Sequence, residues 1–221
     1  MFAHVRRISI PLAMLAATTA NAGSAYDEFS AASNPSGAWS YGWKTTLAGS
    51  FNLFSNKLSA NNHDYWYGPQ APLGGLPGYP EIDRSTIDAP GILLAHPGSG
   101  GEYAILRWIA PTTSAYNIST QFSRQDTAPT TTDVYVILGG VTLFSGALNA
   151  SSASQSFSQS IALNAGSVLD FAVGYGSNGN YFFDRTGIGA AVSVVPELPA
   201  HVLLACGLFY LRRQMLRRAD A

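Results

Sequence analysis

Cysteine is almost absent from this chain of 221 residues: the single one, Cys206, lies in an apolar run near the C-terminus. The rest of the chain therefore has no internal disulfide available. Its stability has to come from a packed core, which a domain of about 170 residues is large enough to build. The shortage also argues against zinc, because only His63 and His96 remain as strong ligands between residues 23 and 199.

Basic residues are scarce in the central part of the chain. Half of the 12 Lys and Arg lie near the two ends, so residues 23–199 carry six cations against 12 anions, a net charge of −6. Nucleic-acid binding depends on basic patches that displace counterions from phosphates. The sequence therefore predicts no nucleic-acid partner, and its acidic centre disfavours adhesion to anionic lipid.

A helical period of useful length is missing between Gly23 and Pro199. Short segments with alternating apolar and polar residues recur instead, separated by Gly, Pro, Asn and Ser. Residues 116–122 and 133–138 are examples, and the second is followed by Gly139-Gly140, which predicts a tight hairpin. We expect an all-β domain over residues 23–194, a two-sheet antiparallel β-sandwich of jelly-roll type with about ten short strands.

Residues 61–90 interrupt this pattern. Prolines and glycines crowd the segment and its periodicity is weak, so it predicts a long irregular loop. The aromatic residues Tyr65, Trp66, Tyr67 and Tyr79 favour an ordered loop that covers one sheet.

The N-terminus has the layout of a secretory signal. Arg6 and Arg7 lie in a positive region, residues 8–17 form an apolar stretch, and Ala20-Asn21-Ala22 is a small-x-small cleavage site. We therefore expect a helical signal peptide over residues 1–22, recognised by the export machinery.

The C-terminal residues 195–221 form a second targeting element. Val195, Pro196 and Glu197 precede an apolar run over residues 200–211, and arginines follow, beginning with Arg212 and Arg213. Clustered arginines after an apolar run stop transfer and stay on the cytoplasmic side. The apolar helix would be about 18 Å long against about 30 Å of hydrocarbon, so a transient inner-membrane anchor fits better than a lasting span.

This order of parts resembles the C-terminal sorting tail of PEP-CTERM exported proteins, with Leu198 where a second proline usually stands. The resemblance implies an exosortase-type processing enzyme as partner; an ordinary single-pass anchor is the alternative. The body is also similar to the β-rich passenger domain of such proteins, which implies the same fold and location. The matching residues are 34–42, 96–98, 107–108, 131–134, 170–174 and 184–187.

Aromatic residues suggest a carbohydrate-binding surface. Trp39, Tyr41 and Trp43 alternate, so on a strand they share one face, while Trp66 and Tyr67 form a second group. Such rings can stack on sugar faces, although rings on one face of a strand also build cores. The candidate contacts are therefore Trp39, Trp43, Trp66 and Tyr67, with extracellular polysaccharide as the ligand.

Polysaccharide cleavage by a glycoside hydrolase or lyase is the alternative. Glu81-Ile82-Asp83 resembles the start of the Glu-x-Asp-x-x-Glu strand motif of a sandwich-fold glycosidase family, but Thr86 replaces the closing carboxylate. Hydrolysis needs two carboxylates about 5–9.5 Å apart. We interpret Glu81 and Asp83 as solvated loop charges, so no catalytic residue is assigned.

Calcium is the one metal for which the sequence offers candidate ligands. Asp133, Asp170 and Asp184 lie at expected strand ends or turns, where carboxylates suit a structural Ca²⁺. Aspartates in turns also serve their own backbone, so these residues remain weak candidates and no cofactor is required. Taken together, the sequence predicts an exported, non-enzymatic protein of the cell surface or exopolysaccharide matrix, structural or carbohydrate-binding.

Overall fold

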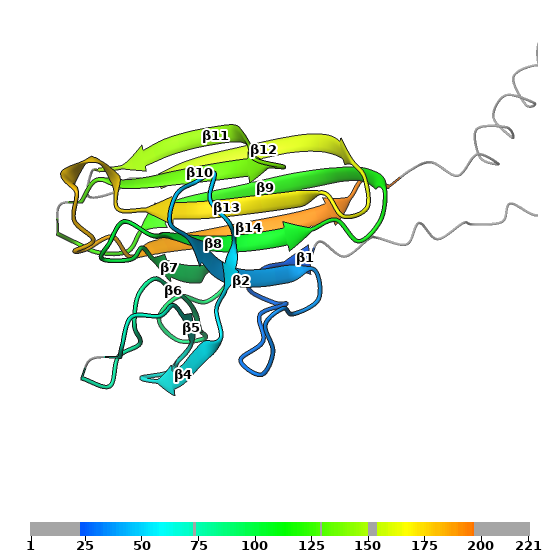
Figure 1. Ribbon diagram of the computed structural model, residues 1–221. Coiled ribbons are helices and arrows are strands. Elements are labelled where there is room, and N and C mark those ends of the chain that lie inside the picture. Colours follow the sequence, from blue (N-terminus) through cyan, green and yellow to red (C-terminus); the bar gives the residue numbers. More distant parts are fainter. Residues whose placement is uncertain (1–22, 73, 129, 150–153, 197–221) are drawn as a thin grey trace, which may run out of the picture.

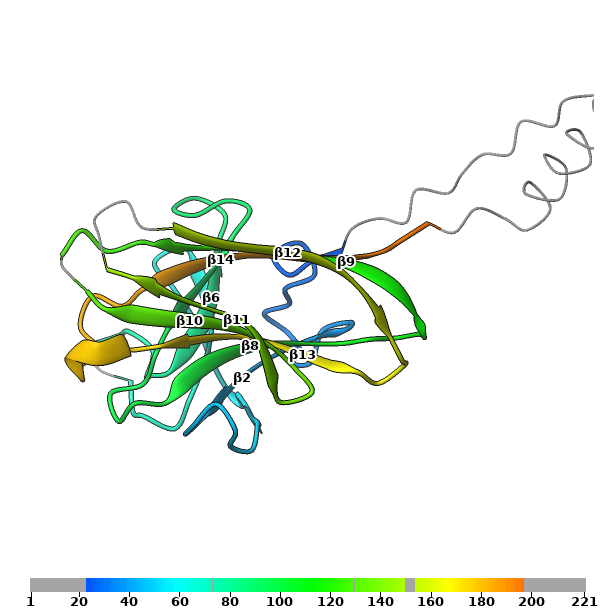
Figure 2. The same ribbon diagram turned by 90° about the horizontal axis from the view of Figure 1, so that it is seen from above.

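The computed structural model describes residues 23–72, 74–128, 130–149 and 154–196, which form two antiparallel sheets packed face to face (Figures 1 and 2). Sheet A contains β1 (Gly23–Ser24), β4 (Asn56–Ala60), β5 (His63–Tyr67), β6 (Glu81–Ser85), β7 (Leu93–His96), β9 (Ser114–Arg124), β12 (Ser154–Leu163) and β14 (Thr186–Val194). Sheet B contains β2 (Trp39–Lys44), β3 (Asn52–Leu53), β8 (Tyr103–Ile109), β10 (Thr132–Leu138), β11 (Val141–Leu148) and β13 (Val168–Gly174). The expected two-sheet all-β fold is confirmed.

The strand order shows how the chain winds between the sheets. Sheet A runs β12-β9-β14-β7-β6-β5-β4, with β1 beside β14, and sheet B runs β11-β10-β13-β8-β2-β3. From β7 onward, the strands of sheet A are ordered β12-β9-β14-β7 and those of sheet B β11-β10-β13-β8. This is the order in which a jelly roll arranges its two four-stranded sheets. The strands β2 to β6 extend both sheets on the same side.

Alternation along the strands builds the core between the sheets. In β9, Tyr116, Ile118, Thr120 and Phe122 are buried while the residues between them are exposed, as the pattern predicted. Val134 and Val136 of β10 are buried opposite them in the same core. The predicted hairpin between β10 and β11 is also present, because Gly139 and Gly140 have φ of 56° and 88°, which favours glycine.

The segment 61–90 corrects the prediction of a long irregular loop. It contains β5 and β6, which pair with each other, and β6 also pairs with β7. Strand β6 has the sequence Glu-Ile-Asp-Arg-Ser, and its single apolar residue does not make an alternating pattern that indicates a strand. The prolines lie instead in the connection from residue 69 to residue 80 and in the turn after β6.

The two targeting segments lie largely outside the described residues. These include the predicted signal helix over residues 1–22, Glu197, and the apolar helix with Arg212 and Arg213. Val195 is described, and its N–H donates to the carbonyl of Ala115 at 2.8 Å just after β14. No helix within the described part of the chain is long and apolar enough to cross a bilayer.

Candidate functional site

Two carboxylates lie on the outer face of sheet A, where β5, β6 and β7 are neighbours. Ile82 points into the core, so Glu81 and Asp83 point to the opposite face. Their exposed fractions are nevertheless only 4% and 0%. The interpretation of these residues as solvated loop charges is therefore wrong, because they lie on a paired strand beneath covering loops.

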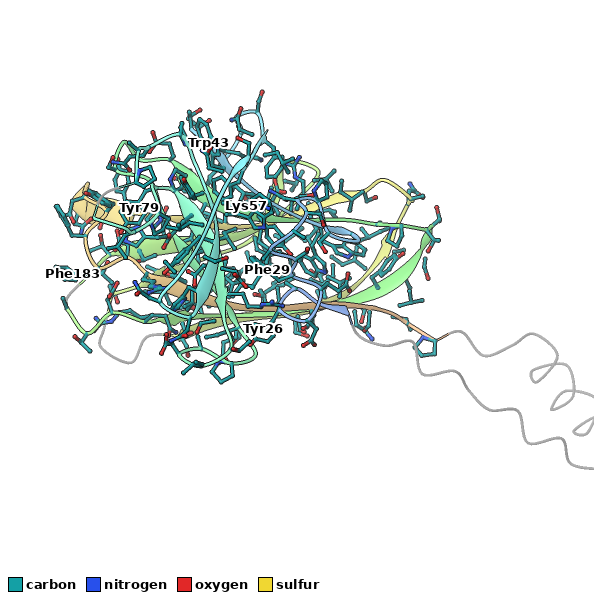
Figure 3. All side chains as sticks on the ribbon, turned by 90° about the horizontal axis from the view of Figure 1, so that it is seen from below. Tyr26, Phe29, Trp43, Lys57, Tyr79 and Phe183 are labelled. Carbon is teal, nitrogen blue, oxygen red and sulfur yellow. The ribbon has the colours of Figure 1, made fainter. Side chains whose placement is uncertain are left out.

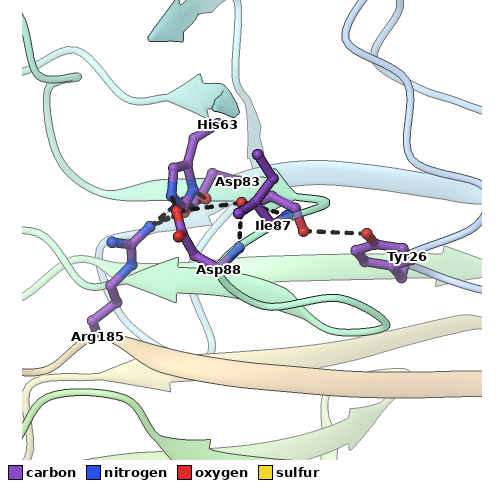
Figure 4. A network of polar contacts seen from close by, with 7 residues as sticks. Tyr26, His63, Asp83, Ile87, Asp88 and Arg185 are labelled. Atoms are coloured by element: carbon purple, nitrogen blue, oxygen red, sulfur yellow. Dashed lines mark hydrogen bonds and ion pairs between the residues drawn. The ribbon is translucent and has the colours of Figure 1, made fainter. Parts of the chain in front are cut away.

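Asp83 is the centre of a charged network (Figure 4). Its carboxylate accepts hydrogen bonds from Arg185 at 3.0 and 3.1 Å and pairs with Nδ1 of His63. The other ring nitrogen, Nε2, lies 2.7 Å from Asp88 Oδ2. The hydrogen bond to Asp83 raises the pKa of His63 above its usual value, which favours the imidazolium. Asp83 is thus paired with the guanidinium of Arg185 and with the imidazole of His63.

The turn after β6 holds Asp88 in place. Ser85 Oγ accepts hydrogen bonds from the N–H groups of Ile87 at 3.2 Å and Asp88 at 3.0 Å. The hydroxyl of Tyr26 donates to the Ser85 carbonyl at 3.1 Å, so the N-terminal segment also contacts this turn. The network therefore fixes β5, β6 and the start of β14 relative to one another.

Glu81 differs chemically from Asp83. Burial, and then the negative charge of Asp83, raise the pKa of Glu81 well above its ordinary value. Its Oε2 atom is buried and has no hydrogen-bond partner among the described residues. The folded protein holds the proton of Glu81 more tightly than the unfolded chain does. Protonation of Glu81 therefore stabilises the fold fully at acidic pH, and this stabilisation is lost as the pH rises through the folded-state pKa. The raised pKa of Glu81 favours its neutral form beside the Asp83–Arg185 ion pair.

A cleft of about 430 Å³ lies over Glu81 on the outer face of sheet A. Its polar wall is formed by Glu81, His96, Asp126 and Arg185. Two loops complete it, one between β5 and β6 and the other before β14, and Figure 3 shows Tyr79 and Phe183 from these loops at the same end of the molecule. The remaining lining residues are apolar or aromatic: Tyr65, Leu76, Pro77, Tyr79, Tyr181, Phe182 and Phe183.

Aromatic rings are stacked along the cleft. Tyr79 lies on His96 with ring centroids 4.3 Å apart, and Tyr181 meets Tyr79 edge-on at 5.5 Å. Tyr181 stacks on Phe182 at 4.6 Å. Phe182 and Phe183 remain 59% and 54% exposed, which is costly for large apolar rings unless a ligand covers them. The cleft thus offers ring faces beside hydrogen-bonding groups.

Phe183 also has an unusual backbone conformation. Its φ is 65°, in the left-handed region that bulky side chains rarely adopt. Such strain is concentrated at functional sites, where the surrounding structure enforces it. The neighbouring Asp184 provides one anchor, because its Oδ1 accepts a hydrogen bond from Thr132 of β10 at 2.8 Å.

The predicted carbohydrate contacts separate into two pairs. Trp39 and Trp66 are 0% and 6% exposed and belong to the core, so neither presents a ring to a ligand. Trp66 Nε1 instead donates to the Ser30 carbonyl at 2.8 Å. Trp43 and Tyr67 are half-buried and line a hollow of about 240 Å³ outside the cleft. The structure therefore corrects the prediction for Trp39 and Trp66 and brings Trp43 and Tyr67 together.

The three weak calcium candidates each have protein partners. Asp133 accepts hydrogen bonds from the Tyr135 hydroxyl and the Gly176 N–H, both at 2.8 Å. Asp170 accepts from Arg107 at 2.7 Å and pairs with Lys44 at 2.9 Å. Within the described ranges, no group of three or more His, Cys, Asp or Glu side chains is arranged to hold a metal ion.

Sequence reasoning did not identify most of the cleft. The run Tyr181-Phe182-Phe183 follows a polar turn, where three consecutive aromatic residues have no place in a strand pattern. That mismatch was the available signal for an exposed aromatic group. The pairing of Arg185 with Asp83 joins residues 102 positions apart, and no local pattern reveals it.

Comparisons with known proteins leave the family open. No protein-family model matches the chain, and no curated protein matches it.

Several solved structures have a similar arrangement of strands. The CBM51 domain of a Clostridium perfringens GH95 protein, in complex with methyl-galactose, has a TM-score of 0.37 and 12% identity, covering 59% of this chain and 92% of that one. A structure described as "CBM4 structure and function" has a TM-score of 0.33 and 15% identity over 64% and 96% of the two chains. A Stig cyclase from Fischerella sp. TAU has a TM-score of 0.34 and 10% identity over 73% and 86%. At these scores, the similarities assign no function to this chain.

Proposed function

We propose that this protein is a carbohydrate-binding β-sandwich whose cleft over sheet A holds extracellular polysaccharide. The observation that carries the proposal is the pair of exposed rings, Phe182 and Phe183, at the rim of a cleft with polar groups on its wall. Sugar rings have apolar faces that stack on aromatic rings, and hydroxyl groups that need fixed donors and acceptors.

The polar groups of the cleft suit hydroxyl recognition. Glu81 has an oxygen without a partner among the described residues, and its raised pKa favours the neutral carboxyl, which both donates and accepts hydrogen bonds. Burial lowers the pKa of His96, which favours the neutral imidazole; its Nδ1–H donates to the Pro97 carbonyl at 2.9 Å, which leaves Nε2 as an acceptor. The positive charge of Arg185 is compensated by Asp83. The wall therefore offers hydrogen-bond donors and acceptors, and its positive charge is balanced by Asp83.

Removing the exposed rings should abolish retention without unfolding the protein. We expect Phe182→Ala to lower affinity about tenfold or more, as loss of an aromatic anchor commonly does. Phe183→Gly should weaken binding similarly, yet change the free energy of unfolding by less than about 1 kcal/mol, because glycine relieves the left-handed φ while loosening the unfolded chain. Affinity electrophoresis measures how strongly both variants are retained by soluble neutral glucans, galactans, mannans and xylans, and co-sedimentation measures their retention by the insoluble forms.

Val141→Ala is the matched control for that experiment. Val141 is 66% exposed in β11, away from the cleft, and its replacement should leave retention unchanged. Retention by none of these polysaccharides, or retention indifferent to both phenylalanine variants, would refute the proposal.

We further propose that the chain is exported through residues 1–22 and sorted at the cell envelope through residues 195–221. The sorting motif Val195, Pro196 and Glu197 and the arginines Arg212 and Arg213 support this, as does the agreement of two export elements in one chain. Processing by an exosortase-type enzyme should release the domain into the exopolysaccharide matrix. Mass spectrometry of the exported protein should find a shortened C-terminus only when that enzyme is present, whereas an intact Ala221 would contradict processing.

Hydrolysis of polysaccharide in the same cleft is the second candidate function. Glu81 supports it, because a buried carboxyl with a raised pKa is suited to act as general acid, and Asp126 lines the same cleft. Such activity should fall as the pH rises through the pKa of Glu81, since the acid must be protonated. New reducing ends in the binding incubations, absent with Glu81→Gln, would establish cleavage; their absence with every polysaccharide would leave binding alone.

A further inference from the structure

A second hollow lies at the edge of the sandwich beside the cleft. Trp43 of β2 and Tyr67 of β5 line it, together with the exposed amides of Asn52 and Asn56. None of the residues that the structure places around this hollow is charged. Leu53 adds apolar surface, with 42% of it exposed. The hollow therefore combines half-buried aromatic side chains with neutral hydrogen-bonding groups.

Tyr67 packs against the loop that forms one wall of the cleft. Tyr67 lines the hollow, and a Cβ at Gly78 would lie only 3.3 Å from Tyr67 Cδ2. Gly78 lies between Pro77 and Tyr79, which both line the cleft. The N–H of Gly68 in turn donates to the Pro80 carbonyl at 2.7 Å, which holds the two walls together.

In the view of Figure 3, the labelled Phe183, Tyr79 and Trp43 run from the left edge of the molecule toward its top. Tyr65 lines the cleft and Tyr67 lines the hollow, and because they are two residues apart on β5 they point to the same face of sheet A, so the two depressions are neighbours.

We infer that the cleft and the Trp43–Tyr67 hollow are two subsites for one neutral polysaccharide chain. This inference rests on the proposed function and adds the length and charge of the ligand. A chain that leaves the cleft over Tyr67 meets Trp43 next, and the amides of Asn52 and Asn56 lie beside it. The uncharged lining favours a neutral polymer over a uronic one, because a carboxylate would lose water there without gaining a cation.

Chain length is the property that tests the inference. A polymer that spans both subsites should bind more tightly than a trisaccharide, which fills the cleft alone. Asn52→Arg should lower the affinity for the polymer about tenfold and leave the trisaccharide unaffected, because it fills the hollow from an exposed position. Isothermal titration of the full-length chain with the retained polysaccharide, and with its trisaccharide, measures both affinities.

Two further variants complete the design. Trp43→Ala should have the same selective effect on the polymer; its thermal unfolding is recorded in parallel, because Trp43 also packs against the core. Asn149→Arg places the same charge at an exposed position outside both depressions and should change neither affinity.

The outcomes separate the two hypotheses. If Phe182→Ala abolishes binding but Asn52→Arg leaves the polymer affinity unchanged, the second subsite does not exist and the cleft remains. Equal loss of polymer and trisaccharide with Asn52→Arg also overturns the inference. If neither ligand binds the wild-type chain, the proposed function fails, and the inference with it.

Discussion

Arg185→Met is expected to lower the free energy of unfolding by about 3–5 kcal/mol, the usual cost of removing one partner from a buried ion pair. Asp83 is 0% exposed and accepts two hydrogen bonds from Arg185, beside its pairing with His63 Nδ1. Without the guanidinium, the carboxylate keeps only His63 and lies beside Glu81. Methionine preserves much of the arginine's apolar stem, so the loss reports on charge. Chemical denaturation at neutral pH measures it.

The control and the coupling test are both available in sheet A. Lys57 is an exposed cation of β4, and Lys57→Met should change stability by no more than about 0.5 kcal/mol. Asp83→Asn removes the charge that Arg185 compensates. The double variant Asp83→Asn/Arg185→Met should therefore lose less free energy of unfolding than the two single variants lose together. Additive losses would show that Arg185 stabilises the fold by packing, and not through Asp83.

Asp170→Ala is expected to lower the free energy of unfolding by a similar amount, about 3–5 kcal/mol, because it leaves two cations on the outer face of sheet B without their counterion. Arg107 donates to both oxygens of Asp170, at 2.7 and 2.9 Å, and Lys44 lies 2.9 Å away. The side chains of Lys44 and Asp170 are only 7% and 4% exposed. The ring of Phe51 covers Arg107 at 4.0 Å. Thermal and urea unfolding should both report the loss.

Asp64→Ala is the matched comparison for that variant. Its partner Arg84 lies 3.8 Å away, and their side chains are 33% and 26% exposed, so the pair should contribute less than about 1 kcal/mol. A calcium-dependent stability of the wild-type chain that Asp170→Ala removes would instead return Asp170 to the role of metal ligand. Equal effects of the two substitutions would contradict the buried network.

The fold was largely predictable because its core strands alternate regularly. In β9 every second residue is buried, and the glycine pair after β10 identifies a hairpin. The short strand β6 was not predictable in the same way. Its carboxylates Glu81 and Asp83 face outward and look solvated in sequence, since the covering loop and Arg185 come from distant parts of the chain.

The residues of the candidate site were not predictable from the sequence. Aromatic residues suggested sugar binding, yet Trp39 and Trp66 lie in the core, whereas Phe182 and Phe183 are exposed. A single sequence does not distinguish these cases, because the same ring fits a core or a binding face. Burial depends on which face of the strand meets the other sheet, and β2 points Trp39 into the core between the sheets. There its ring centroid lies 6.0 Å from that of Phe171 on β13 of the same sheet.

The most direct test of the central claim is an NMR titration of the chain, with labelled phenylalanine and tyrosine, using the polysaccharide it retains. The account predicts ring shifts for Phe182, Phe183 and Tyr181, with the core ring of Phe171 unaffected. Shifts confined to Tyr103 and Tyr175, which line a separate hollow at the end of sheet B, would place the ligand elsewhere and contradict the account.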